Sequence, residues 1–331
     1  MKGFWVAFVL TVCVPALSAK QAQAKLPVKV LVLTMFEVDK NTGDSAGEFQ
    51  HWYEAHFAKA KSYDVKGFMN PLYLNDRGVA GCLTGMGKAQ AASTLTAILS
   101  DGRFDFSHMY ILVAGCAGIS PARGTVGDIV WADALVDYEL GHAWTESDVT
   151  KSMKGTFARD PLYDRSGYIP LNKELVQWAY KLTKDCPLAD DSQAAAYRAN
   201  YGPAEAKEKP SVRKGVSVTG DNYWHGKGSS VHADAVCASY RTESPYMAAQ
   251  MEDNAFGLVA LNFGLLDRFL VCRVAVDFDR PHDGQSVVES LKADSGGFLI
   301  GMKNGFIVGS KVVEAIVSGW NIYAEQTPKT K

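Results

Sequence analysis

The alternation of short, apolar, β-branched runs with helical segments most constrains the fold of this chain. The expected strands cover 28–35, 79–84, 108–114, 215–219 and 269–276, with one more beginning at 127; the expected helices cover 46–61, 89–99, 172–184, 247–263 and 298–323. Runs of this kind are typical of buried parallel strands. Their alternation with helices predicts a single α/β domain with a mostly parallel, mixed central sheet flanked by helices.

Composition and charge limit the function classes. The chain has 331 residues, of which 47% are hydrophobic and 21% charged, so it can bury a large core. Its formal net charge is -2, and it has no long run of lysine or arginine. Nucleic-acid binding, which needs a basic surface, is therefore disfavoured.

The first 24 residues have the layout of a secretory signal peptide. Lys2 precedes a mostly apolar run over 4–17, and small residues follow it at 17–19 and 22–24. An uncleaved membrane anchor is the alternative, but the run is shorter than the ~20 residues that span a bilayer. We expect cleavage, export to the periplasm or beyond, and no transmembrane segment in the mature chain.

Residues 25–331 form the expected domain, with an insertion at about 141–210. The strand and helix pattern weakens there around one convincing helix, so we interpret the segment as an elaboration and not as a second domain. The cysteines after Cys13 have neither CxxC nor Cys/His zinc spacing. No disulfide framework, metal site or cofactor is predicted.

Two glycine-rich segments follow expected strands. Residues 84–87 and 115–118 each come at a strand end, where ligands collect in open α/β sheets. The first lacks the spacing of a Walker loop and of a full GxGxxG motif, so a plain tight turn is the alternative. In the second, Cys116 has no partner histidine that can be placed beside it. A small residue lining a cleft is the simpler interpretation.

Three later segments carry aromatic or acidic side chains that are candidates for a ligand site. Tyr223 and Trp224 are adjacent aromatics able to stack on a planar base, with core packing as the alternative. Glu252 and Asp253 are adjacent carboxylates near the start of an expected helix; one of them could accept hydrogen bonds from sugar hydroxyls, or both could merely complement the helix dipole. Two acids, Asp277 and Asp279, end the last expected strand beside Arg280; a carboxyl group there could protonate a leaving base if burial raises its pKa, and the alternative is a loop of ordinary ion pairs.

Taken in order, these segments resemble the motifs of the nucleoside phosphorylase/nucleosidase superfamily. The similar segments are 84–92, 115–121 with 127–130, 219–224, 251–252 and 273–277. A closer resemblance, to the purine nucleoside permease group, lies in 223–226, 250–254 and 278–281. The combination spans nearly all of the expected mature chain.

The resemblance implies a purine nucleoside ligand and a role for each matching residue. Tyr223 would stack on the base or sugar, and Trp224 would contact the base through its backbone. Met251 and Glu252 would hold the ribose, while Asp277 would protonate the purine leaving group. Cys116, Ala117 and Gly118 would line the floor beneath the sugar, although nucleosidases usually have serine at the first of these positions.

Departures from the superfamily pattern bear on the reaction. Hexameric phosphorylases carry an arginine where this chain has Val113, and an arginine-containing loop where it has residues 34–39. Two phosphate-binding arginines are thus missing, which favours hydrolysis over phosphorolysis. Nucleosidases carry a water-activating acid in that first loop, and on spacing we expect Asp39 in preference to Glu37; a plain polar loop is the alternative.

Two other functions are compatible with the sequence. Phosphorolysis would need phosphate held by Arg280 or by backbone N–H groups of the glycine turns. A soluble nucleoside-binding component of transmembrane nucleoside transport would need no catalysis. The sequence leaves open whether the chain forms a homo-oligomer.

Overall fold

A central mixed sheet organises the computed structural model, which describes residues 3, 24–143, 157–158 and 164–330. Within this part the sheet has ten strands, in the order β11-β8-β12-β13-β7-β2-β5-β4-β3, with β14 paired to both β7 and β8. The expected single α/β domain is confirmed. Most of the expected signal peptide and the middle of the expected insertion lie outside the described residues, so those two predictions stay untested.

The pairing of the strands closes part of the sheet into a ring. The sheet strands are β2 (Val30–Thr34), β3 (Lys61–Tyr63), β4 (Leu72–Leu74), β5 (Val79–Leu83), β7 (Tyr110–Ile119), β8 (Ile129–Asp137), β11 (Tyr168–Pro170), β12 (Val212–Thr219), β13 (Tyr246–Gln250) and β14 (Phe269–Phe278). Strands β5, β2, β7 and β14 run parallel, as do β8, β12 and β13. The antiparallel pairs β13–β7 and β14–β8 join the two groups.

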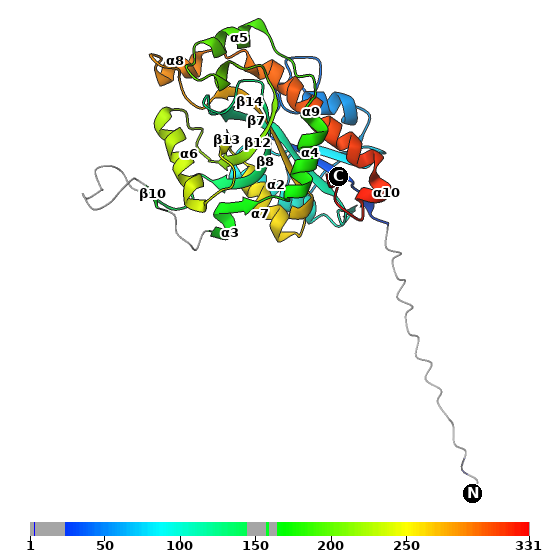
Figure 1. Ribbon diagram of the computed structural model, residues 1–331. Coiled ribbons are helices and arrows are strands. Elements are labelled where there is room, and N and C mark those ends of the chain that lie inside the picture. Colours follow the sequence, from blue (N-terminus) through cyan, green and yellow to red (C-terminus); the bar gives the residue numbers. More distant parts are fainter. Residues whose placement is uncertain (1–2, 4–23, 144–156, 159–163, 331) are drawn as a thin grey trace.

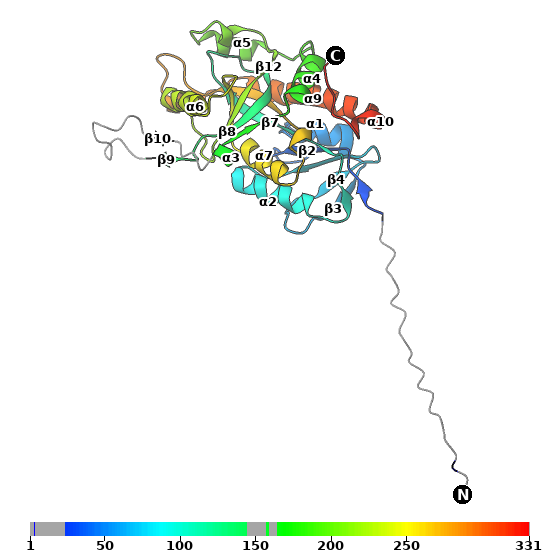
Figure 2. The same ribbon diagram turned by 60° about the horizontal axis from the view of Figure 1, so that its bottom comes forward.

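Helices cover both faces of the sheet. They are α1 (Gln50–Trp52), continued by the π-helix Tyr53–Phe57, then α2 (Lys88–Leu99), α3 (Asp164–Gly167), α4 (Lys173–Thr183), α5 (Ser192–Ala199), α6 (Lys227–Tyr240), α7 (Asp253–Asn262), α8 (Val287–Lys292), α9 (Gly297–Ser318) and α10 (Trp320–Tyr323). Helices α2 and α7 pack on one side, and α4 and α9 on the other (Figures 1 and 2). The short elements are β1 (Leu26–Pro27), β6 (Phe104–Asp105), β9 (His142–Ala143), β10 (Phe157–Ala158) and the 3-10 turns Glu205–Lys207 and Leu266–Arg268.

Local sequence explains why these elements form where they do. Every residue of β2 is buried, as expected for a central strand covered on both faces. The Asn172 side chain caps α4 by accepting hydrogen bonds from the N–H groups of Glu174 and Leu175. Inside the core, the indole N–H of Trp131 donates to Thr183 Oγ1 at 2.9 Å, so the polar edge of a fully buried ring is satisfied.

The structure corrects several expected boundaries. Residues 115–118 are not a turn, because β7 continues to Ile119 and pairs with β14 from Gly115↔Arg273 to Gly118↔Asp277. The expected helix 247–263 is wrong at its start: residues up to Gln250 belong to β13 and the helix begins at Asp253. Helix α1 begins at Gln50, after a loop, and helices α6 and α8 were not predicted.

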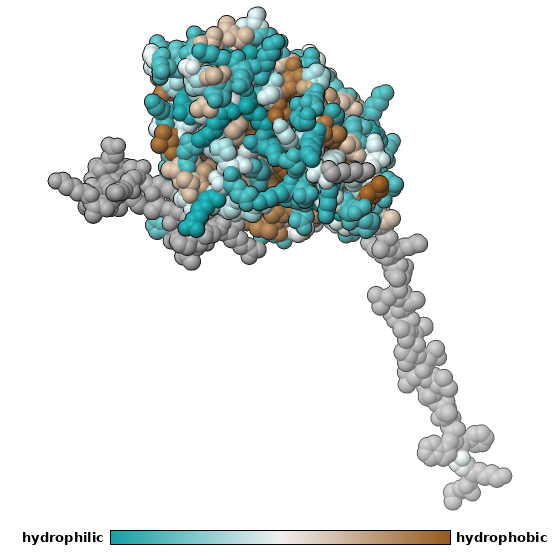
Figure 3. Space-filling model, in the orientation of Figure 1, coloured by the Kyte–Doolittle hydropathy of each residue, from teal (hydrophilic) through white to brown (hydrophobic). Residues whose placement is uncertain are grey.

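The face of the molecule in Figure 3 is largely hydrophilic, and hydrophobic side chains gather on it only in small patches. No helix within the described ranges is both long and apolar enough to cross a bilayer.

Candidate functional site

Residues from several strand ends line one cavity of about 100 Å³, here called the central pocket. Its lining consists of Met35, Phe36, Glu48, Met86, Cys116, Ala117, Gly118, Tyr223, Ala249, Gln250, Met251, Glu252, Arg273, Val276 and Asp277. Seven of the nine residues selected from the sequence therefore share this pocket. Trp224 lines a smaller adjoining cavity together with Tyr223 and Asp277. The ninth, Asp39, lies elsewhere.

An irregularity in β14 directs Asp277 into the pocket. The register of β14 against β7 shifts between Ala275 and Asp277, which makes Val276 the extra residue of a β-bulge. Successive side chains normally point to opposite faces of a strand, but here Val276 and Asp277 both line the pocket. Opposite them, a Cβ on Gly118 would lie 3.0 Å from Asp277 Oδ1, so glycine leaves room for the carboxyl group.

The Asp277 carboxyl group is suited to donate a proton near neutral pH. Burial raises its pKa to about 6, an effect that the nearby Asp279 reinforces. The Tyr223 hydroxyl donates a hydrogen bond to Asp277 Oδ2 at 2.7 Å and so acts in the opposite direction. An acid with this pKa can protonate a leaving group and still exchange its proton afterwards.

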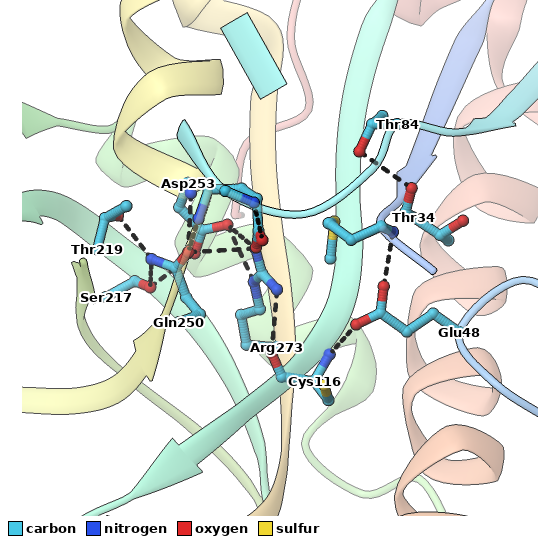
Figure 4. Close-up of polar contacts among 12 residues, drawn as sticks. Thr34, Glu48, Thr84, Cys116, Ser217, Thr219, Gln250, Asp253 and Arg273 are labelled. Carbon is cyan, nitrogen blue, oxygen red and sulfur yellow. Dashed lines mark hydrogen bonds and ion pairs between the residues drawn. The ribbon is translucent and has the colours of Figure 1, made fainter. Parts of the chain in front are cut away.

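Glu252 is held in place by a buried ionic cluster. Its carboxylate accepts hydrogen bonds from the Gly87 N–H at 2.9 Å and from Arg273 Nη2 at 3.0 Å. Arg273 also donates to Asp253 at 2.6 Å and to the Cys116 carbonyl at 3.0 Å. Figure 4 shows Arg273 between Asp253 and Cys116. Because Arg273 is 1% exposed and its partners are buried, these contacts hold the Glu252 carboxylate at the pocket wall.

Glu48 is a functional candidate that sequence reasoning missed. Its carboxylate accepts hydrogen bonds from the Met35 N–H at 2.6 Å and the Cys116 N–H at 2.8 Å, which ties the loop after β2 to β7 (Figure 4). The residue is 6% exposed. Burial raises the pKa of its carboxyl group to about 7, although Arg273 lowers it. Glu48 can therefore accept a proton inside the central pocket.

The two acids expected to activate water take other positions. Asp39 is exposed, with φ 57°, and does not line the central pocket. Glu37 accepts hydrogen bonds from the N–H groups of Gly47, Phe49 and Gln50, and so shapes the loop that carries Glu48. The loop returns to the end of β2, where the Glu48 N–H donates to the Phe36 carbonyl at 3.2 Å. The spacing of residues along the sequence does not predict that this loop folds back to the end of β2.

Tyr223 and Trp224 differ in their surroundings. Trp224 stacks on Tyr138 with ring centroids 5.1 Å apart, so its side chain is largely engaged in packing. Tyr223 is 60% exposed and its ring remains available to a ligand. The Cys116 thiol is enclosed, and burial raises its pKa well above the ordinary value, which keeps it a neutral lining group.

The groups considered for phosphate binding already have partners. Arg280 donates to Asp279 Oδ1 at 2.7 Å and to Ser120 Oγ at 2.9 Å. In the glycine turn after β5, the Gly87 N–H bonds Glu252 and the Lys88 N–H bonds Asp221 at 2.7 Å. Carboxylates thus occupy the donors that would have met an anion.

Comparison with known proteins places the chain in a family. Residues 27–328 match the family model described as purine nucleoside permease. The chain belongs to the purine nucleoside permease family. A Schizosaccharomyces pombe protein named "Probable purine nucleoside permease" is 26% identical, over 89% of this chain and 90% of its own. A Candida albicans purine nucleoside permease is 25% identical, over 91% of this chain and 78% of its own.

Solved structures show that this purine nucleoside permease family member has a nucleosidase fold. The Streptococcus pyogenes S-adenosylhomocysteine nucleosidase superposes with a TM-score of 0.56 at 17% identity, covering 89% of this chain and 98% of the other. For the Helicobacter pylori futalosine hydrolase the TM-score is 0.55 at 15% identity, with 87% and 98% covered. The family and fold expected from the motifs are confirmed; the roles of the site residues stay predictions.

Proposed function

We propose that this protein binds a purine nucleoside and hydrolyses its N-glycosidic bond. The observation that carries the proposal is the pair Asp277 and Glu48, two carboxyl groups with raised pKa values that line one pocket. A third carboxylate, Glu252, lines the same pocket and is fixed by Arg273. Paired acid and base groups beside a sugar-binding carboxylate suit cleavage of a glycosidic bond.

Each group has a distinct role in the proposed reaction. Glu252 accepts hydrogen bonds from the ribose hydroxyls, and Tyr223 contacts the base with its ring. Asp277 gives its proton to the purine as the bond between the anomeric carbon and the base nitrogen breaks with both electrons going to the base. A water oxygen bonds to the anomeric carbon and releases a proton to Glu48. Exchange with solvent then returns both carboxyl groups to their starting states.

Two features support water over phosphate as the nucleophile. The superfamily's phosphate-binding arginines are replaced at Val113 and in residues 34–39. The alternative donors, Arg280 and the amides of the glycine turn, bond carboxylates. An incoming phosphate would have to break these contacts and lie among acidic groups.

Incubation with a panel of nucleosides, with and without phosphate, tests the proposal. We expect release of purine base and free ribose at a rate that phosphate does not change. Formation of ribose 1-phosphate only when phosphate is present would show phosphorolysis instead. Chromatography of bases and sugars distinguishes the two outcomes.

Asp277→Asn tests the assigned acid, because the amide keeps the shape of the side chain but cannot donate a carboxyl proton. We expect base release to fall by about 10²- to 10⁴-fold while the nucleoside still binds. Unchanged base release by this variant, with binding intact, would exclude Asp277 as the proton donor.

A nucleoside-binding component of transport is the second candidate, favoured by the names of the relatives. In that role the protein would be exported, bind nucleoside and deliver it to a separate membrane protein. Tight binding of inosine or adenosine with no base released over a long incubation would support this function and exclude hydrolysis.

A further inference from the structure

A second cavity, of about 220 Å³, lies beyond Tyr223 and is here called the α8 cavity. Its walls come from α5, the segment after β12, the end of β14, α8 and the start of α9. The lining residues are Tyr197, Tyr223, His225, Val276, Asp277, Ser290, Leu291, Ala293, Asp294, Ser295 and Phe298. In Figure 1 helices α5 and α8 lie near each other at one edge of the molecule. Helix α5 comes from the segment expected to be an insertion.

The α8 cavity and the central pocket share Tyr223, Val276 and Asp277. The hydrogen bond from the Tyr223 hydroxyl to Asp277 therefore stands at the boundary between the two cavities. Glu48 and Glu252 line only the central pocket of these two. If the sugar of a ligand lies beside Glu48 and Glu252, its leaving base must reach Asp277. The base then extends from the central pocket into the α8 cavity.

The wall of the α8 cavity carries a chain of polar groups. His225 Nε2 lies 3.0 Å from Ser290 Oγ, and the Ser290 hydroxyl also interacts with Tyr197. The Tyr197 and Tyr201 hydroxyls are 3.0 Å apart, and Tyr201 donates to the Arg280 carbonyl at 2.9 Å. Burial lowers the pKa of His225, so its ring is neutral at physiological pH and can donate from one nitrogen and accept at the other.

One of these polar atoms has no partner. His225 Nδ1 is buried and makes no hydrogen bond within the described part of the chain. A buried polar atom without a partner costs free energy, so a ligand or a small ring movement that satisfies it is favoured. Beside it, the Ser290 hydroxyl can donate or accept.

We propose that the α8 cavity receives the purine base and that His225 and Ser290 bind the polar edge of its six-membered ring. The inference rests on the proposed function, since it takes the sugar to lie in the central pocket. The base enters as the Tyr223 hydroxyl leaves Asp277, which frees the acid to contact the base. The neutral imidazole and the hydroxyl favour purines with a 6-oxo or 6-amino group over unsubstituted purine.

Calorimetric titration of the purified protein with hypoxanthine, adenine, unsubstituted purine and D-ribose tests the inference. We expect Ser290→Ala and His225→Ala to weaken hypoxanthine and adenine binding by about tenfold each, with little effect on unsubstituted purine or on ribose. Lys292→Ala, at an exposed position of α8, is the matched control and should bind all four compounds as the wild type does.

Base affinity unchanged in both variants would overturn the inference, and so would an equal loss of base and ribose binding, which would show a merely structural role. If the wild type binds ribose and nucleoside but its variants keep full discrimination between hypoxanthine and purine, the proposed function stands and this inference fails. No binding of any base or nucleoside to the wild type would overturn both.

Tyr223→Phe tests the movement of the hydroxyl. This variant keeps the ring but loses the hydrogen bond to Asp277, so the base no longer has to displace it. We expect hypoxanthine and adenine to bind more tightly, by about five- to tenfold. Weaker binding of the bases by this variant would contradict the displacement and would instead show that the hydroxyl contacts the ligand.

Discussion

At the residue scale, the proposed reaction assigns opposite tasks to two carboxyl groups of the site. Asp277 must be protonated to give a proton to the base, and Glu48 must be ionised to take one from water. Burial raises both pKa values, that of Asp277 to about 6 and that of Glu48 to about 7. The acid therefore has the lower pKa of the two, and only a minority of molecules hold both groups in the required state at any pH.

The pH dependence of base release follows from these values. Glu48 becomes protonated as the pH falls and Asp277 loses its proton as the pH rises, so activity should decrease below about pH 6 and above about pH 7. We expect a bell-shaped profile of kcat/KM with its maximum between the two values. A profile that is flat from pH 5 to pH 8 would contradict the assignment.

Glu48→Gln should remove one limb of that profile. We expect base release to fall by about 10²- to 10⁴-fold, since the amide cannot accept the water proton. The remaining activity should level off at low pH instead of declining, because Asp277 alone then titrates. Asp39→Asn is the matched control: its side chain is exposed away from the pocket, and we expect wild-type rates. Loss of activity in Asp39→Asn would instead support Asp39 as the acid that activates water.

At the element scale, β14 supplies both the proposed acid, Asp277, and the cation that holds Glu252. Arg273 and Asp277 are four residues apart on this strand, and the bulge at Val276 lies between them. The ring formed by β7, β14, β8, β12 and β13 buries Arg273 at 1% exposure. The strand therefore couples the stability of the core to the geometry of the site.

Arg273→Met tests that coupling. The change leaves Glu252 and Asp253 buried without their shared cation, so we expect the free energy of unfolding to fall by about 3–5 kcal/mol in urea denaturation. Arg77→Met is the control, since Arg77 pairs with Glu314 on the surface and its loss should cost at most about 1 kcal/mol. Equal effects of the two changes would show that the buried cluster contributes little.

Gly115→Ala tests the close contact between β7 and the loop that carries Glu48. A Cβ at this position would lie 2.0 Å from Met35 Cε, 2.7 Å from Arg273 Nη1 and 2.8 Å from Glu48 Oε1, so these side chains must shift, Glu48 among them. We expect base release to fall at least tenfold, because small displacements of a catalytic group are costly. Gly102→Ala is the control, with nothing within 4 Å of its new Cβ. Wild-type kinetics for Gly115→Ala would show that the loop adapts without moving Glu48.

At the scale of the whole molecule, the chain combines a nucleosidase fold with a family named for permeases. Both proposed functions place the nucleoside in the same pocket, and they differ in whether the bond is cleaved. Export would suit either of them. Knowing the compartment would therefore identify the source of the ligand but not the reaction.

Expression of the full chain in a bacterium tests export. Because Lys2 and the apolar run over 4–17 form a signal-like segment, we expect the protein in the periplasmic fraction with an intact mass that lacks residues 1–24. Replacing Leu10 with Arg should keep the protein in the cytoplasm by interrupting the apolar run. If the wild-type protein is found in the cytoplasmic fraction with residues 1–24 still present, the segment is not a signal peptide.

Local sequence patterns are enough to assign the α/β class, six of the ten strands of the central sheet, and the segments that carry Tyr223, Glu252 and Asp277. These assignments follow from local periodicity and from motifs that are short continuous segments of the sequence. Contacts in the folded chain bring Glu48 and not Asp39 to the central pocket, and they continue β7 through residues 115–118. Both depend on which segments pair across long sequence separations: the loop after β2 returns to β7, and β14 aligns with β7. Local residue patterns do not encode such contacts.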